Sequence, residues 1–281
     1  MRARNACCAG ALVVFASAIC LAGCAARDPS SSASALPPGK PWKLDFHDEF
    51  GGGSLNKRVW HTCFSWATTT CSIGSNHELE VYDPAGVTVT RGALRLTARR
   101  RAMVGWDGKR YAYTSGMVMT GGREDGQRPG FTFTYGFAEA RVRVPKGEGL
   151  WPAFWMLPAD YASRPEIDIM EILGGSTNVQ RMHFHYVGRN GTKVDSGSDW
   201  TGPDFAAGWH TFAVAWGPDA IVWYVDGVRR WRFAAASRIS REPMYLLLNL
   251  AVGGDYPGPP DSSTPFPSSF DVDYVRVWQR G

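Results

Sequence analysis

Short runs of alternating or apolar residues, separated by turn-forming residues, fill the chain from residue 42 to residue 278. The clearest runs lie at 87–89, 94–96, 137–144, 212–216, 245–252 and 272–278. Two further runs flank Asp226-Gly227, a pair typical of a tight β-hairpin turn, so residues 221–228 predict a hairpin. No long segment keeps a helical period, and no internal repeat is present. The pattern predicts one all-β domain over residues 42–281, built as a sandwich of curved antiparallel sheets with a concave face.

The first residues have the pattern of an export signal. Arg2 and Arg4 precede an uncharged, apolar stretch over residues 5–26 that contains Leu21-Ala22-Gly23-Cys24. This box looks like a bacterial lipoprotein processing site. It predicts a signal peptide over 1–23, a lipidated Cys24, and a flexible Ser/Pro-rich tether over 24–41. An ordinary cleaved signal and a membrane-spanning anchor are the alternatives. We expect an exported protein, either anchored in the periplasm or at the cell surface, or secreted.

The remaining cysteines form a single pair. Cys7, Cys8 and Cys20 lie in the predicted signal, which leaves Cys63 and Cys71 besides Cys24. In an oxidising compartment, an even pair predicts a disulfide. Two cysteines without a nearby Cys/His pair are too few ligands for a metal site.

The composition narrows the classes of molecule that this protein could bind. The chain is 44% hydrophobic and 20% charged, which suits a packed core. Loss of Arg2 and Arg4 with the signal would lower the formal charge from +4 to +2, too mild a value to suggest nucleic acid. The 12 Trp, 10 Tyr and 14 Phe fill a core, and they also permit a cleft that stacks sugars on aromatic rings.

The densest group of candidate catalytic residues is Glu166-Ile-Asp-Ile-Met-Glu171. In a strand, Glu166 and Asp168 share one face, and strict alternation would send Glu171 into the core. A buried unpaired carboxylate is costly, so we predict a β-bulge at Ile169-Met170 that returns Glu171 to the face of the other acids.

Three carboxylates in a row suit the hydrolysis of glycosides. The outer pair would have Cα atoms roughly 13 Å apart, and converging side chains close the carboxyl gap to roughly 5–6 Å, the separation of retaining glycosidases. Asp168 between Glu166 and Glu171 can share a hydrogen bond and separate their protonation states. The alternative is a charged, exposed strand face, but adjacent like charges repel.

These residues, with others along the chain, resemble glycoside hydrolase family 16 in its laminarinase-like form. The matching blocks are Asp48-Glu49-Phe50, Asn76-His77-Glu78-Leu79, Thr114-Ser115-Gly116, Tyr135-Gly136, Glu139-Ala140-Arg141, residues 149–155, 166–171, 223–227 and 249–254, and Asp273-Tyr274-Val275-Arg276-Val277. The resemblance implies a β-jelly-roll sandwich and endo-acting, retaining hydrolysis of β-1,3 or mixed β-1,3/1,4 glucan. It assigns Glu166 as nucleophile, Asp168 as its helper and Glu171 as general acid/base.

The resemblance also implies sugar-binding positions. Trp151 and Trp155 are expected as aromatic platforms, and the alternative is that both are core residues. His183 and His185 alternate on one strand and are expected to face the cleft, where metal binding by the pair has no further support. Asn76, Glu139 and Arg141 match sugar-contacting positions, although the last two could form a surface ion pair. Tyr256 stands near the place of a usual Trp.

No cofactor is expected for catalysis. Glu49, the carbonyl of Gly92 and Asp273 fall where many family members hold a structural Ca²⁺, and oxygen ligands suit that ion. We expect a monomer whose partner is a polysaccharide. Rival functions are a transglycosylase, a depolymerase of another polymer such as a bacterial exopolysaccharide, and a non-catalytic glucan-binding protein.

Overall fold

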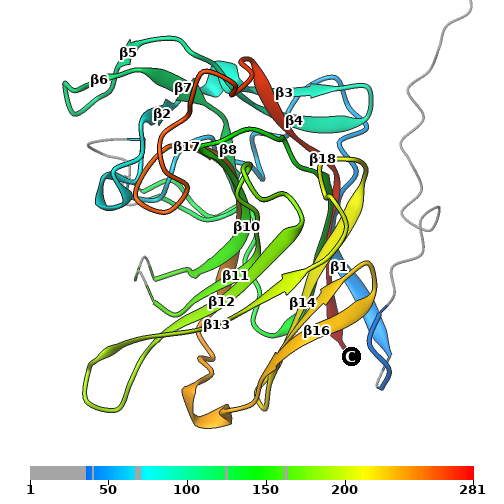
Figure 1. Ribbon diagram of the computed structural model, residues 1–281. Coiled ribbons are helices and arrows are strands. Elements are labelled where there is room, and N and C mark those ends of the chain that lie inside the picture. The colour runs from blue at the N-terminus through cyan, green and yellow to red at the C-terminus, as the bar shows by residue number, and fades with distance from the viewer. Residues whose placement is uncertain (1–35, 40, 67–70, 124–125, 161, 163) are drawn as a thin grey trace, which may run out of the picture.

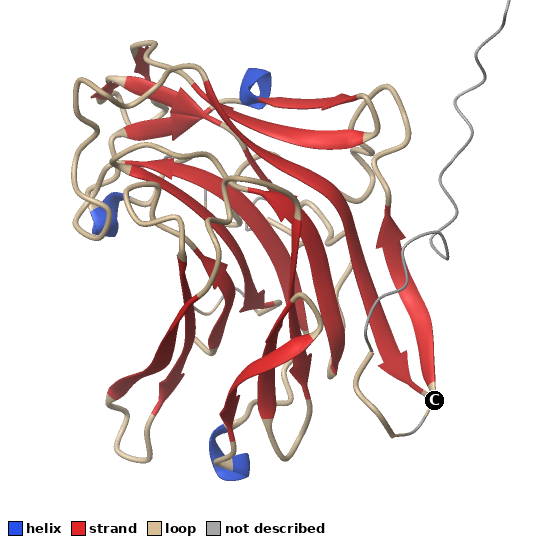
Figure 2. Cartoon of the chain, turned by 45° about the vertical axis from the view of Figure 1, so that its right-hand side comes forward, coloured by secondary structure: helices blue, strands red, loops and turns tan. Residues whose placement is uncertain are grey.

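Two curved β-sheets face each other in the computed structural model, which describes residues 36–39, 41–66, 71–123, 126–160, 162 and 164–281 (Figures 1 and 2). Both sheets are antiparallel, and the regular strands of the described residues are accompanied only by three short 3-10 turns. No helix among these residues has the length and apolar character needed to cross a membrane. The predicted all-β sandwich is confirmed.

One sheet has eight strands in the order β16-β15-β14-β9-β18-β4-β3, with β1 also paired to β18. Its strands are β1 (Trp42–Asp48), β3 (Val87–Thr90), β4 (Ala93–Ala98), β9 (Gly136–Arg143), β14 (His210–Trp216), β15 (Ile221–Val225), β16 (Val228–Phe233) and β18 (Ser268–Arg280).

The other sheet has six strands in the order β13-β12-β11-β10-β17-β8. Its strands are β8 (Met117–Met119), β10 (Leu150–Pro158), β11 (Glu166–Glu171), β12 (Val179–Val187), β13 (Lys193–Thr201) and β17 (Met244–Val252).

Small elements lie beside the two sheets. Strands β2 (Glu80–Tyr82) and β7 (Tyr113–Ser115) form a parallel pair, and β5 (Met103–Val104) and β6 (Arg110–Tyr111) form an antiparallel pair. The 3-10 turns are η2 (Gly74–Asn76), η3 (Pro84–Gly86) and η4 (Ala236–Arg238).

The hydrophobic core lies between the two sheets, and strand alternation decides which residues enter it. On β17, Leu246, Leu248 and Leu250 point into this core. Tyr245 and Leu247, which alternate with them, belong to a second hydrophobic cluster on the other face of the same sheet. Burial on both faces explains why all nine residues of β17 are buried.

The second cluster is covered by the segment between β1 and β2, and a disulfide fastens that segment. Cys63 and Cys71 are bonded, with 5.4 Å between their Cα atoms, so the predicted pairing is confirmed. Phe64 and Trp66 stack with 4.5 Å between ring centroids, and Phe64 also contacts Trp155 of β10. The bridged segment therefore forms one wall over the six-stranded sheet.

The strands predicted from the sequence all appear. The predicted hairpin is β15–β16, with Val225 paired to Val228 and positive φ at both Asp226 and Gly227. Two consecutive residues with positive φ are what a type I′ turn requires. The Asp-Gly prediction is confirmed.

Candidate active site

The three acids lie on β11, which carries the predicted bulge. Along β12, Asp168 pairs with His183, but the next pair is Glu171 with Arg181, so β11 advances three residues while β12 advances two. Along β10, the register also shifts by one residue, between the Trp155–Asp168 and Phe154–Met170 pairs. The extra residue falls at Ile169-Met170, and the bulge is confirmed.

Two buried side chains hold the backbone of the bulge. The indole Nε1 of Trp223 donates to the carbonyl of Asp168 at 2.8 Å. The amide Nε2 of Gln180 donates to the carbonyl of Ile169 at 2.8 Å. Both residues are fully buried. They satisfy carbonyl groups at the point where the ladder is interrupted.

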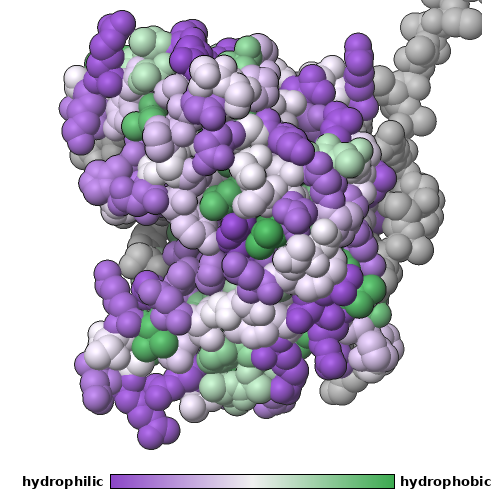
Figure 3. Space-filling model, viewed as in Figure 1, coloured by the Kyte–Doolittle hydropathy of each residue, from purple (hydrophilic) through white to green (hydrophobic). Residues whose placement is uncertain are grey.

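The bulge separates apolar from acidic side chains. Ile167, Ile169 and Met170 point into the main core. Glu166, Asp168 and Glu171 instead line a cavity of about 540 Å³ on the other face of the sheet. In Figures 1 and 3 the molecule is indented between its β2 end and its β12–β13 end, and mostly hydrophilic residues surround this indentation.

Glu171 is held at both carboxylate oxygens. Trp151 Nε1 donates to Oε1 at 3.1 Å, and His183 Nδ1 donates to Oε2 at 2.6 Å. Trp151 comes from β10 and His183 from β12, so the two strands flanking β11 fix this side chain. Glu171 is 7% exposed, which leaves it in contact with the cavity.

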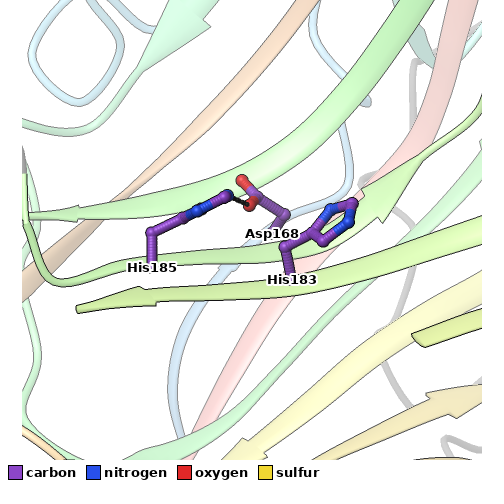
Figure 4. A group of neighbouring side chains, drawn as sticks. All are labelled: Asp168, His183 and His185. Carbon is purple, nitrogen blue, oxygen red and sulfur yellow. Dashed lines mark ion pairs between the residues drawn. The ribbon is translucent and has the colours of Figure 1, made fainter. Parts of the chain in front are cut away.

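Asp168 lies beside a second histidine (Figure 4). His185 Nε2 is 2.9 Å from Asp168 Oδ2, and the opposite ring nitrogen, Nδ1, donates to Asp195 Oδ1 at 2.6 Å. Arg164 donates to the same Asp195 oxygen at 2.8 Å. A chain of polar contacts thus runs from the centre of the acid row to the rim of the cleft.

The protonation of the acid row follows from burial and crowding. Burial, followed by repulsion from Asp168, holds the pKa of Glu166 well above its ordinary value. Burial, followed by repulsion from Glu171, raises the pKa of Asp168 well above its ordinary value. Because these carboxylates repel one another when ionised, burial and crowding together disfavour the fully charged form of the acid row.

His183 is drawn into the same network. Its hydrogen bond to Glu171 is the largest influence on the ring and raises its pKa. His183 and His185 stack with 5.6 Å between ring centroids. Both predicted histidines therefore face the cleft, but each is bonded to a carboxylate of this chain.

Asp168, His183 and His185 bring their donor atoms within 4.8 Å of one another, the only such group of three or more His, Cys, Asp or Glu residues in the described part of the chain. Nδ1 of each ring donates to a carboxylate, and Nε2 of His185 lies 2.9 Å from Asp168 Oδ2. These contacts join the cluster to the polar network of the acid row.

Aromatic side chains form the walls of the cleft. Trp151 packs edge-on against Tyr256, with 5.2 Å between ring centroids, and Tyr256 is 44% exposed. Burial raises the pKa of Tyr256 to about 12, so its hydroxyl stays protonated. Trp155 is 7% exposed and lines the cavity while packing in the second cluster. Trp155 is therefore a core residue that also reaches the cleft, and its role as a sugar platform stays a prediction.

A buried chain of hydrogen bonds leads from the cleft floor to Asn76. Trp155 Nε1 donates to Asn249 Oδ1 at 2.8 Å, and Asn249 Nδ2 donates to the Tyr82 hydroxyl at 2.9 Å. Tyr82 in turn contacts Glu78 at 3.5 Å, and Glu78 accepts a bond of 3.0 Å from Asn76 Nδ2. Asn76 lines the cavity as predicted, with its amide oriented by Glu78.

The pKa values of two glutamates at this end of the cleft are raised. Burial is the main cause that raises the pKa of Glu78. Burial, followed by repulsion from Glu78, raises the pKa of Glu80 well above its ordinary value. Glu80 Oε2 accepts from the Val252 backbone N–H at 2.7 Å, which ties β2 to the end of β17.

Several cavity-lining residues were not predicted from the sequence. Among them are Trp66, Ser72, Ile73 and Glu78, from the disulfide-bridged region and the residues just after it, and Asn249 from β17. Trp66 lies between the two bridged cysteines, and that position was the one signal that could have placed it near the cleft.

The structure does not bring Glu139 and Arg141 to the cleft, and their predicted contact with sugar is wrong. Both lie on β9 in the eight-stranded sheet, where the alternating Ala138 and Ala140 occupy the core. Their side chains therefore point to the outer face of the sandwich. Glu139 accepts from the Tyr274 hydroxyl at 2.9 Å, and Arg141 pairs with Asp273 at 2.7 Å.

The calcium set predicted at Glu49, Gly92 and Asp273 also lies on this outer side, away from the acids. Arg276 donates to both carboxylate oxygens of Glu49 at 2.8 Å, and Arg141 pairs with Asp273. Arginine already neutralises both carboxylates, so these side chains do not form an open set of oxygen ligands for Ca²⁺. Calcium binding at these residues stays a prediction. The predicted lipidation site, Cys24, lies outside the described residues.

Comparisons with known proteins agree with this geometry. Residues 80–276 match the family model described as glycosyl hydrolases family 16. The chain is 33% identical over 264 residues to glucan endo-1,3-beta-glucosidase A1 of Niallia circulans, covering 84% of this chain and 38% of that protein. It is 33% identical over 254 residues to endo-1,3-1,4-beta-glycanase ExsH of Rhizobium meliloti, covering 83% of this chain and 51% of that protein.

The fold has close counterparts among solved structures. The X-ray structure of endo-beta-1,3-glucanase from Pyrococcus furiosus superposes with a TM-score of 0.73 at 36% identity, covering 86% of this chain and 96% of that one. The chain thus spans about half or less of the two curated relatives but nearly the whole of this catalytic structure.

Proposed function

This chain belongs to glycosyl hydrolase family 16, and from that premise we propose that it hydrolyses internal bonds of a β-1,3 or mixed β-1,3/1,4 glucan with retention of configuration. The observation that carries the proposal is the bulged strand β11, which turns Glu166, Asp168 and Glu171 onto one face inside a cavity of about 540 Å³. The named activities of the two curated relatives support the choice of glucan.

In the first step, the ionised Glu166 attacks the anomeric carbon while Glu171 donates a proton to the departing oxygen. This attack requires the negative charge on Glu166, so a proton retained by the acid row has to lie on Asp168 at this moment. The glycosidic bond breaks, and an ester forms between the sugar and Glu166.

In the second step, Glu171 accepts a proton from water as that water attacks the anomeric carbon. The ester to Glu166 breaks, and the sugar leaves with its original β configuration. Two inversions at one carbon give net retention. The donors Trp151 and His183 stabilise the carboxylate form of Glu171 that this step needs.

The remaining cleft residues are proposed to bind the chain of sugars. Trp151, Tyr256 and Asn76 line the cleft beside Glu171, where they offer two aromatic rings and an amide. An open cleft of this kind suits attack within a polymer rather than at its end.

Proton NMR of the first product tests the mechanism. We expect laminarin or lichenan to give oligosaccharides whose new reducing ends are initially β, and an initial α-anomer would contradict the mechanism. Digests of agarose and bacterial exopolysaccharides, with product sizing, separate a glucanase from a depolymerase of another polymer. Products longer than the substrate would reveal a transglycosylase, and no cleavage of any polymer would indicate a glucan-binding protein.

Substitution of the acids assigns their roles. Glu171→Ala should abolish cleavage of glucan but spare the first step with activated aryl glycosides, because those leaving groups need no proton. Glu166→Ala should abolish turnover of both substrates, and α-configured glycosyl fluorides should bypass the missing nucleophile. Equal losses on both substrates in Glu171→Ala would contradict its role as the acid.

We also propose that the enzyme is exported and held at a membrane through a lipid on Cys24. The Leu-Ala-Gly-Cys box and the Ser/Pro-rich residues after it support this proposal. The Cys63–Cys71 disulfide is consistent with an oxidising compartment.

A further inference from the structure

A glycine stands in the middle of the edge strand β13, where glycine weakens a strand and therefore needs a reason. Gly197 pairs with His183 across the β12–β13 ladder. A Cβ atom on Gly197 would collide with His183 Cδ2, and it would lie 2.9 Å from Nε2 of the same ring and 3.0 Å from the Met182 carbonyl oxygen. The φ angle of Gly197 is not positive, so the backbone conformation does not require glycine. The lack of room for a Cβ atom beside the His183 ring does.

The opposite edge of the His183 ring contacts the acid row. Nδ1 is 2.6 Å from Glu171 Oε2, while Nε2 faces Gly197. One face of the ring stacks against His185. The ring therefore fills the space between β13 and Glu171, and a side chain at position 197 would displace it from the distance that the short hydrogen bond needs.

We propose that His183 is a positioning residue for Glu171, and that Gly197 has no side chain so that His183 can reach it. This inference rests on the proposed role of Glu171 as general acid/base. Trp151 binds one oxygen of the carboxylate and His183 the other, so together they fix its plane.

Other charged groups surround this contact and stay unchanged in the test. They are Glu166 and Asp168 on β11, Arg181 and His185 on β12, Asp195 and Asp199 on β13, and Tyr256 after β17. Because these groups are common to all variants, differences in pH dependence between the variants report on the His183–Glu171 contact.

Three substitutions and one control test the proposal on glucan. His183→Ala should lower kcat/KM about tenfold and change its pH profile, because the imidazole whose pKa this contact raises is lost. His183→Asn keeps an N–H near the position of Nδ1 and should restore much of the wild-type kcat/KM. Gly197→Ala should reproduce the changes of His183→Ala. Gly208→Ala should match the wild type, because a Cβ atom added at Gly208 would have no neighbouring atom within 4 Å.

The double variant Gly197→Ala/His183→Ala decides between positioning and general damage. We expect it to resemble His183→Ala alone, because without the imidazole a methyl group at position 197 has nothing to displace. Additive losses, or a pH profile of His183→Ala that matches the wild type, would overturn the inference. Failure of the proposed function is distinguishable, since the wild-type protein would then not cleave glucan at all.

Discussion

A carboxyl group that is fully buried beside another, as Glu80 is beside Glu78, stays protonated far above the pH at which it ionises in water. In the unfolded chain Glu80 ionises near its ordinary pKa, about 4.3. Because the folded-state pKa is the higher of the two, the unfolded state releases its proton first as pH rises. Folding stability is therefore lost between about pH 4 and the raised pKa of Glu80.

Glu80→Gln should remove this pH dependence. Glutamine keeps an oxygen for the Val252 N–H but has no proton to lose. Relative to the wild type, the variant should gain up to about 1.4 kcal/mol per pH unit above pH 4 until the folded-state pKa is reached. Thermal unfolding at pH 4 and pH 7 measures the change. The matched Glu242→Gln, at an exposed site, should stay within about 0.5 kcal/mol of the wild type at both values.

A Glu80→Gln advantage that is equal at pH 4 and pH 7 would contradict the raised pKa. It would mean that Glu80 ionises alike in the folded and unfolded chains.

The sequence predicted the position of some cleft residues correctly and of others wrongly, for one reason. Alternation gives the face of a strand but not the sheet to which the strand belongs. His183 and His185 were placed correctly because β12 adjoins β11, whereas Glu139 and Arg141 share a face on β9 in the opposite sheet. The contact of His183 with Glu171 was beyond prediction, since it depends on the space at Gly197.

At the scale of one element, the bulge in β11 was predictable because a regular strand would have buried a carboxylate in the core, which is energetically costly. Strict alternation would have buried Glu171 in place of Met170. The side chains that hold the bulge were not predictable. Gln180 and Trp223 lie 11 and 55 residues beyond the carbonyls that they bind, and such distant partners leave no local pattern.

Gln180→Leu should show what the bulge contributes to catalysis. Leucine fits a similar volume but leaves the Ile169 carbonyl buried without its amide partner, at a cost of about 1–3 kcal/mol. A looser bulge should turn Glu171 away from Glu166, so we expect glucanase activity to fall about tenfold or more. Urea unfolding and initial rates measure the two effects.

Met182→Leu is the matched control for that substitution, because Met182 is fully buried on the same strand and belongs to the hydrophobic core. A volume-conserving exchange should cost less than about 1.5 kcal/mol and leave the rate unchanged. If Gln180→Leu lost stability without losing more activity than Met182→Leu, the bulge would not depend on this amide.

For the whole molecule, the sandwich followed from many short strands with turn signals, and the concave cleft followed from the sandwich. The position of one wall of that cleft could not be predicted from the strand pattern. The segment that carries Trp66 and Asn76 has few strand residues, and its position depends on the disulfide and on the second hydrophobic cluster. Irregular segments that fold over a sheet are set by tertiary contacts, which periodicity does not encode.

The relation of the whole enzyme to a membrane is open to a direct experiment. If Cys24 carries the lipid, the 12 residues from Cys24 to Ala35 span at most about 40 Å before Leu36, which packs against the domain. That reach is long enough to hold the cleft clear of the bilayer, so substrate access should not depend on the anchor. Release from the membrane should then leave the enzyme's kinetic constants unchanged.

Cys24→Ala in the full chain should therefore move the protein from the membrane fraction to the soluble fraction of its cell envelope while kcat/KM on soluble glucan stays the same. Cys20→Ala is the matched control, since Cys20 precedes the processing box and should leave the anchored fraction unaltered. Fractionation, immunoblotting and mass spectrometry of the N-terminal peptide give the readouts. Full membrane retention of Cys24→Ala would instead indicate that the apolar stretch over residues 5–26 acts as an anchor by spanning the bilayer.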